Sequence, residues 1–142
     1  MWCELIRALE PAATFTGGVS EPALRRAEAA LGQPIPGALA SLLRESDGVL
    51  GEYALGLVWS LERIVADNLS FRADSNFVDL YMPFRPLLFF ADAGNGDQFA
   101  FLSPPVDRDD VFAWDHEDDS RQWFAADLRH YLEGWITGRL SV

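Results

Sequence analysis

The first fifty residues carry apolar side chains at the spacing of amphipathic helices. Apolar positions recur three and four residues apart, which places them on one side of a helix. Proline, serine and glycine residues mark where such helices begin and end. The pattern predicts three helices: one ending before Pro11, one between Ser20 and Gly32, and one ending at Asp47 and Gly48.

The hydrophobic period shortens to two after residue 50. Large apolar side chains alternate with smaller ones over residues 53–59, which is typical of a strand with one buried face. Ser60 can cap a short helix over residues 61–69, while residues 70–84 fit a helix and a loop equally well. Later apolar runs predict three consecutive antiparallel strands, because the connections are too short for a crossover helix: residues 87–91, 98–102 and 111–115.

Helical spacing returns at the end of the chain. It predicts a helix from a cap around Asp119 or Ser120 to Gly138, with these apolar positions on one face: Phe124, Leu128, Tyr131, Leu132 and Trp135. Helices, then a sheet, then a helix indicate an α+β fold. We expect a mainly antiparallel sheet with the N-terminal helices and the C-terminal helix packed on it, in a single domain over residues 1–142.

Aromatic residues alternate along the predicted strands, and two interpretations are open. They could line a ligand cleft, but aromatics at strand period are more often core. The set is Tyr53, Trp59, Phe89, Phe99, Phe101, Phe112 and Trp114. Core positions are predicted at Leu88, Phe90, Phe101, Trp114 and Leu128.

The chain is strongly acidic, with 22 acidic residues against 11 arginines and a formal net charge of −11. This balance would repel nucleic acid. Nine acids and a single arginine fall between residues 92 and 119, so that segment must face water or a basic partner. With one cysteine, no signal peptide and no run of membrane-spanning length, we expect a soluble, cytoplasmic protein that does not act at a membrane.

The glycine-containing stretch at residues 91–101, "ADAGNGDQFAF", is compatible at first sight with a phosphate loop, a calcium loop or a turn. A phosphate loop would lead into a helix, whereas this stretch leads into a strand. An EF-hand loop needs oxygen ligands at positions that hold glycine here. A hairpin turn is therefore predicted, with Asn95, Gly96 and Asp97 as its structural residues.

Several short motifs resemble the SUKH superfamily, which includes the Smi/Knr cell-wall-assembly-regulator-like proteins. They occur in the family's order: "E-AALGQPIP", "LLRESDG", "LLFFADAGNGDQFAF" and "VFAWDHE". Ile35 and Asp47 stand where the family more often has Leu and Asn. The resemblance implies an α+β fold in which the glycine-containing turn belongs to the scaffold.

The segment "WDHEDDS" at residues 114–120 is the most suggestive chemically, since imidazole beside carboxylates can bind a metal or act as a base. In an extended segment Asp115 and Glu117 share one side and His116 points away, so no metal site is expected. The alternative is the end of a strand running into a helix, where Asp118 and Asp119 face the helix dipole.

The remaining candidates for catalysis are weak. His130 has no partner motif, and Asp92 with Asp97 is better explained as a pair of turn formers. Neither G-x-S-x-G nor H-E-x-x-H occurs, and nothing calls for a cofactor. We therefore expect a protein that is not an enzyme.

The resemblance implies binding, because bacterial members of the superfamily look like immunity proteins that neutralise a cognate toxin, commonly a nuclease. A basic toxin cleft would attract an acidic surface. The alternatives are a regulatory scaffold of the cell-wall-regulator type and, less favoured, a metal-dependent enzyme using Asp115, His116 and Glu117. The expected partner-binding residues are Asp109, Asp110, Asp115, Glu117, Asp118 and Asp119.

Overall fold

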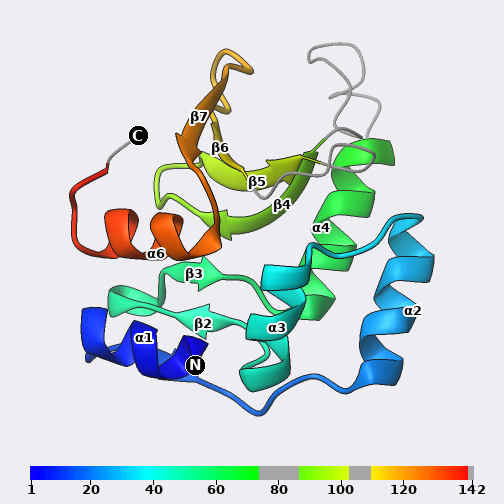
Figure 1. Cartoon of the computed structure of the whole chain (residues 1–142). Helices are drawn as coiled ribbons and strands as arrows, with labels where there is room; N and C mark the ends of the chain where they lie inside the picture. Colours follow the sequence, from blue (N-terminus) through cyan, green and yellow to red (C-terminus); the bar gives the residue numbers. More distant parts are fainter. Residues whose placement is uncertain (74–86, 103–109, 141–142) are drawn as a thin grey trace.

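The computed structural model describes residues 1–73, 87–102 and 110–140, and in these ranges it has an α+β fold (Figure 1). The helices are α1 (Trp2–Leu9), α2 (Glu21–Leu31), α3 (Gly37–Glu45), α4 (Leu61–Ala73) and α6 (Leu128–Ile136), with a 3₁₀ turn η1 (Glu52–Ala54). The strands are β1 (Thr14–Phe15), β2 (Val49–Leu50), β3 (Gly56–Val58), β4 (Leu87–Asp92), β5 (Gln98–Leu102), β6 (Val111–Trp114) and β7 (Arg121–Ala125). The predicted fold class is confirmed.

The larger sheet is a meander of β4, β5, β6 and β7 in chain order, and every neighbouring pair is antiparallel. This confirms the three predicted consecutive strands and adds β7 as a fourth. The smaller sheet, β1-β2-β3, is also antiparallel. The two meet where the backbone N–H of Trp59 donates to the carbonyl of Phe90 at 2.7 Å, so β3 lies beside β4.

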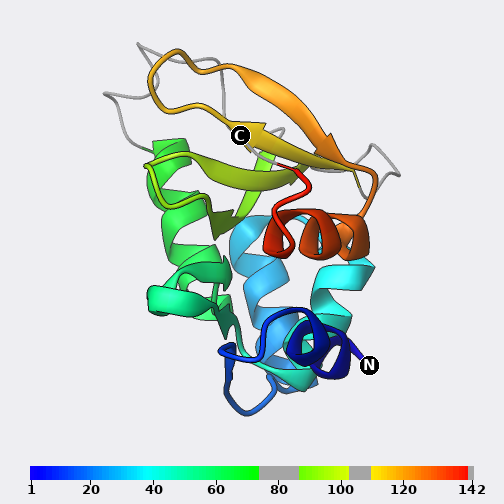
Figure 2. The same cartoon turned by 90° about the vertical axis from the view of Figure 1, so that its left-hand side faces the viewer.

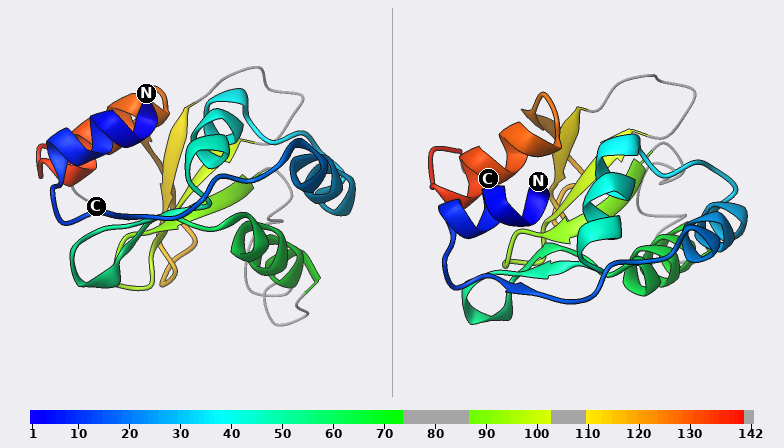
Figure 3. Two further views of the ribbon diagram at one scale, coloured as in Figure 1. Left: turned by 90° about the horizontal axis from the view of Figure 1, so that it is seen from below. Right: turned by 60° about the horizontal axis from the view of Figure 1, so that its bottom comes forward.

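Local signals in the sequence fix the second helix. The Ser20 hydroxyl accepts a hydrogen bond from the backbone N–H of Ala23, and Gly32 ends the helix in the left-handed conformation at φ 71°. Helix α2 packs against α4, and α1 lies alongside α6 (Figure 3). The pairing of α1 with α6 brings the two ends of the described chain to one side of the sheet.

The core is an aromatic layer between the meander and α6. The rings of Phe90 and Phe101 stack with centroids 4.5 Å apart, and Tyr131 of α6 contacts Phe90 and Phe99 edge-on. The Tyr131 hydroxyl is buried and donates to the carbonyl of Leu57 at 2.8 Å, which ties α6 to β3. All five predicted core residues are buried: Leu88, Phe90, Phe101, Trp114 and Leu128.

The predicted strand over residues 53–59 is wrong in its first half. Residues 52–54 form the tight turn η1, in which Tyr53 and Ala54 have positive φ, and strand β3 begins only at Gly56. Alternation of side-chain size continued through the turn and hid it. The two-residue strands β1 and β2 are likewise too short for a periodic pattern to reveal.

The C-terminal helix begins later than predicted. Asp127 caps it by accepting a hydrogen bond from the backbone N–H of His130, and residues 121–125 are strand β7 instead. Phe124 lies four residues before Leu128, so it matched the helical spacing although it belongs to a strand. The acidic turn that precedes β7 therefore joins two strands and does not begin a helix.

Three hairpin turns lie at the same end of the two sheets, as expected for antiparallel neighbours. They join β2 to β3, β4 to β5 and β6 to β7, and they follow one another along the left-hand side of Figure 2. A Cβ placed on Gly94 would lie 3.5 Å from Leu55 Cδ1, and one on Gly96 would lie 2.9 Å from His116 Cε1. We call this surface the turn end, made of residues 52–55, 93–97 and 115–120.

Candidate functional site

The turn end holds most of the acidic residues that the sequence singled out, and its middle turn is built on glycine. Gly94 and Gly96 have φ of 92° and 95°, which a side chain would disfavour. The Asn95 side chain accepts from the N–H of Asp97 at 3.0 Å, and the Asp97 carbonyl accepts from the N–H of Ala93. The stretch is thus a hairpin turn that holds the Asp97 carboxylate in place.

The turn between β6 and β7 is held by its own carboxylates. Asp115 Oδ1 accepts from the N–H of Glu117, and Asp118 Oδ1 accepts from the N–H of Ser120, both at 2.8 Å. The hydrogen bond from the Ser120 N–H, together with one from the Ser120 side chain, lowers the pKa of Asp118. The interpretation of Asp118 and Asp119 as helix-dipole acids is therefore wrong, because both lie in a strand-to-strand turn.

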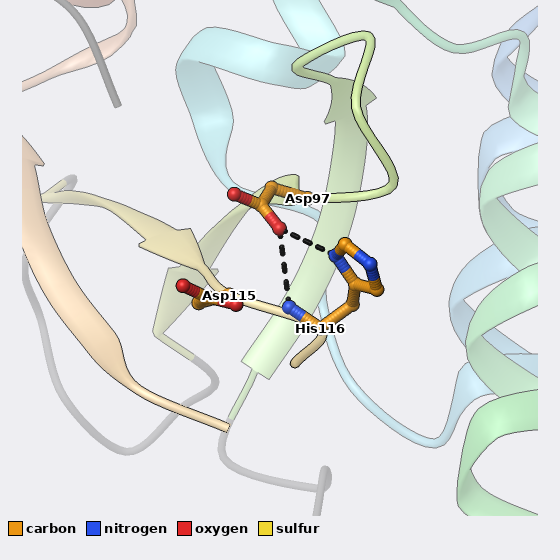
Figure 4. A group of neighbouring side chains, drawn as sticks. All are labelled: Asp97, Asp115 and His116. Atoms are coloured by element: carbon orange, nitrogen blue, oxygen red, sulfur yellow. Dashed lines mark hydrogen bonds and ion pairs between the residues drawn. The ribbon is translucent and has the colours of Figure 1, made fainter. Parts of the chain in front are cut away.

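Asp97 and His116 connect the two acidic turns (Figure 4). Asp97 Oδ1 lies 2.7 Å from His116 Nδ1 and also accepts from the His116 backbone N–H at 3.2 Å. The Asp97 hydrogen bond, assisted by neighbouring carboxylates, raises the pKa of His116. The charged imidazolium is therefore favoured, and it ties one turn to the next.

The same residues form the candidate metal cluster of the described part of the chain. Asp97, Asp115 and His116 each offer a ligand atom, and these atoms lie within 4.8 Å of one another. Glu117 is not among them. The segment was expected to be extended, but it is a tight turn, and this brings ligand atoms of Asp115 and His116 within 4.8 Å of each other although their side chains lie on different sides of the turn (Figure 4). A cation here would have to replace the proton between Asp97 and His116, since those two groups already satisfy each other.

The expected partner-binding carboxylates differ in exposure. Glu117 and Asp118 are exposed and Asp115 is half-buried. Asp110 is buried and accepts from the indole N–H of Trp123 at 3.2 Å, so it is not available to a partner. The carboxylates with described surroundings thus divide into accessible and structural groups, while Asp109 lies outside the described residues.

Asp119 belongs with the structural group. Its side chain is only 11% exposed and accepts from the indole N–H of Trp114 at 2.7 Å and from Arg121 at 3.2 Å. Its φ of 60° closes the turn. Asp119 therefore shapes the turn that presents Glu117 and Asp118.

A comparison of the sequence with models of known protein families shows which family the chain belongs to. The model described as the SMI1 / KNR4 family (SUKH-1) matches residues 18–134, which is most of the chain and includes the whole of the turn end. The chain belongs to the SMI1 / KNR4 family. A comparison with curated protein sequences finds no match.

Other residues considered for chemistry have structural roles in this SMI1 / KNR4 family member. Asp92 forms a double hydrogen bond with Arg63, at 2.8 and 3.0 Å, and does not pair with Asp97. His130 sits on the surface beside the capping Asp127, with Nδ1 2.7 Å from its carboxylate. No helix within the described ranges is long and apolar enough to cross a membrane.

The aromatic set does not line one cleft. Most of its members are buried in the core, Phe112 is half-buried, and Tyr53 is 96% exposed. Tyr53 lies on the turn end, a position that its alternation with Leu55 and Leu57 concealed. The pairing of Asp97 with His116 was also missed, although a meander necessarily places its first and third turns at the same end.

Proposed function

We propose that this SMI1 / KNR4 family protein is a non-enzymatic binding domain of the immunity type, which neutralises a cognate basic toxin such as a nuclease. Domains of this family act in protein–protein interactions and are generally not enzymes. The observation that carries the proposal is the accessible acidic surface formed by Asp115, Glu117 and Asp118 at the turn end. The toxin is the partner, and no cofactor takes part.

Electrostatics explains why such a surface suits a toxin that acts on nucleic acid. A nuclease binds phosphate through a basic cleft, so a cluster of carboxylates can be drawn to that cleft and cover it. The turn end holds these charges in fixed positions, because hydrogen bonds of Asp119 and of the Asp97–His116 pair stabilise the turns. A rigid acidic surface raises the association rate without a cost of ordering loops at the moment of binding.

The test needs the protein encoded beside this gene, if that neighbour has a toxin-like C-terminal domain. Binding of that domain is measured by biolayer interferometry over a series of salt concentrations, alongside survival of cells that express it. The variant Glu117→Gln/Asp118→Asn removes two exposed charges and keeps the Asp118 Oδ1 acceptor. The control Glu4→Gln/Glu62→Gln removes two exposed charges from helices α1 and α4.

We expect the turn-end variant to associate about 2- to 10-fold more slowly at low salt and to protect cells less well, with the difference vanishing at high salt. The control should behave like the original protein. Equal effects of the two variants would mean that only net charge matters, and would place the interface elsewhere. Failure of the unmodified protein to bind or protect would overturn the immunity proposal.

A further inference from the structure

Tyr53 occupies an unusual position in the hairpin turn between β2 and β3. It has φ 58° and ψ 30°, and the next residue, Ala54, has φ 59°. The N–H of Leu55 donates to the carbonyl of Glu52 at 3.3 Å, which closes a four-residue turn. Two consecutive left-handed residues with this bond define a type I′ turn, which strongly favours Asn-Gly at its centre.

Tyrosine and alanine at these positions cost free energy on folding. A Cβ is unfavourable in the left-handed region, and a side chain larger than that of asparagine or glycine is rare there. Tyr53 recovers nothing by burial, because it is 96% exposed. Within the described part of the chain, its hydroxyl makes no hydrogen bond. Folding alone would favour another residue at position 53.

The location of Tyr53 indicates a role other than stabilising the fold. Leu55, two residues on, lies close to the turn between β4 and β5, since a Cβ on Gly94 would be 3.5 Å from Leu55 Cδ1. The same turn carries Asp97, which binds His116, so the turn with Tyr53 and the turn with the accessible carboxylates lie at the same end of the sheets, on either side of it. Glu52, next to Tyr53, is also exposed. An exposed aromatic ring thus stands at one side of an acidic face.

We propose that Tyr53 is an anchor residue of the partner interface and packs against an arginine-bearing surface of a basic protein. Tyrosine is enriched among residues that dominate binding energies. Its ring attracts a guanidinium group placed over its face, and the neighbouring carboxylates favour the same cation. This inference rests on the proposed function, because it assumes that the acidic turn end binds a basic protein.

The decisive variant is Tyr53→Asn/Ala54→Gly, which installs the preferred type I′ pair and removes the ring. We expect its melting temperature to rise by about 2–6 °C, because strain is relieved. We expect its affinity for the toxin domain to fall at least about tenfold, as for loss of a binding hot spot. A purely structural residue could not give higher stability together with weaker binding.

Two matched variants separate the ring from the backbone. Ala54→Gly keeps the tyrosine and relieves strain at one residue, so it should stabilise the protein and weaken binding far less than the double variant does. Tyr53→Phe keeps the ring and should retain most of the affinity. If Ala54→Gly weakens binding as strongly as the double variant, turn rigidity rather than the ring is responsible, and the anchor role is refuted.

The outcomes also separate this inference from the proposed function. If Glu117→Gln/Asp118→Asn weakens binding while Tyr53→Asn/Ala54→Gly binds like the original, the function stands and the anchor role fails. A lower melting temperature of the double variant would show that Tyr53 stabilises the fold, which contradicts the argument from strain. Absence of any binding by the unmodified protein would overturn both proposals.

Discussion

Asn68 on α4 has a buried side chain that forms the backbone hydrogen bonds that a neighbouring strand would otherwise form with part of β4. Its Nδ2 donates to the carbonyl of Phe89 at 2.9 Å, and its Oδ1 accepts from the Phe89 N–H at 2.8 Å. The register of β4 shifts near Phe90, whose carbonyl accepts from the N–H of Trp59, the residue that follows β3. Asn68 therefore satisfies both backbone groups of Phe89.

The substitution Asn68→Leu keeps the approximate size of the side chain and removes both bonds to Phe89. Each buried backbone group left without a partner costs about 1–3 kcal/mol. Burial of the apolar leucine returns about 1–2 kcal/mol. The two groups together cost about 2–6 kcal/mol, so the midpoints of the two ranges give a net loss of about 2–3 kcal/mol in the free energy of unfolding. For a chain of this length, that corresponds to a melting temperature lower by about 5–10 °C.

Urea unfolding followed by tryptophan fluorescence measures this loss, and Ser70→Ala is the control because Ser70 is exposed on the same helix. The control should stay within about 0.5 kcal/mol of the original. Asn68→Asp keeps an acceptor for the Phe89 N–H but places a carboxylate beside the Phe89 carbonyl. It should be more harmful at neutral pH than at a pH where the new carboxyl is protonated. A stability of Asn68→Leu within noise of the original would refute the surrogate-strand role.

The other predictions concern pH and the core. Burial opposes ionisation of Glu45, but two backbone N–H groups at the start of α1 prevail and lower its pKa to about 2. The ionised Glu45 side chain should stabilise the fold above about pH 4.5, and this stabilisation should be lost as the pH falls toward 2. At pH 7, Glu45→Gln should lower the free energy of unfolding, measured in urea, by about 1–2 kcal/mol. An unchanged free energy of unfolding would contradict this prediction. Because the pKa of His116 is raised, its contribution is complete below about pH 6.5 and is lost as the pH rises through the higher folded value. Asp97→Asn should lower the pKa of His116 in an NMR titration and flatten this dependence. A millimolar chelator should leave the melting temperature unchanged, whereas stoichiometric zinc binding that His116→Ala abolishes would establish a metal site. Trp114→Ala and Leu128→Ala should each cost about 2–5 kcal/mol in thermal or urea unfolding, and values within noise would show that these side chains do not support the core.

The helices and strands that the sequence could predict are those marked by several local signals, such as a capping residue and a regular spacing of apolar residues. Helix α2 combines a serine cap, an apolar stripe and a terminal glycine, and the strands of the meander combine alternation with short connections. The start of α6 was missed because Phe124 matches the helical spacing by coincidence, four residues before Leu128. What makes residues 121–125 a strand is pairing with β6, and periodicity within the segment cannot show that.

The candidate site was predictable only in part, because a carboxylate's role depends on which donor the fold brings to it. Asp118 and Asp119 are neighbours of the same type, yet Asp118 is exposed while Asp119 accepts from the Trp114 indole across the turn. Asp110 is removed from the surface in the same way by Trp123 on the adjacent strand. Two of the carboxylates expected to meet a partner are thus fixed by tryptophan N–H groups. Before the charges of such an acidic segment are neutralised by mutation, the carboxylates that hold the turn should therefore be distinguished from those that can contact a partner. Removing a carboxylate that holds the turn would weaken binding by distorting the turn, even if that carboxylate never touches the partner.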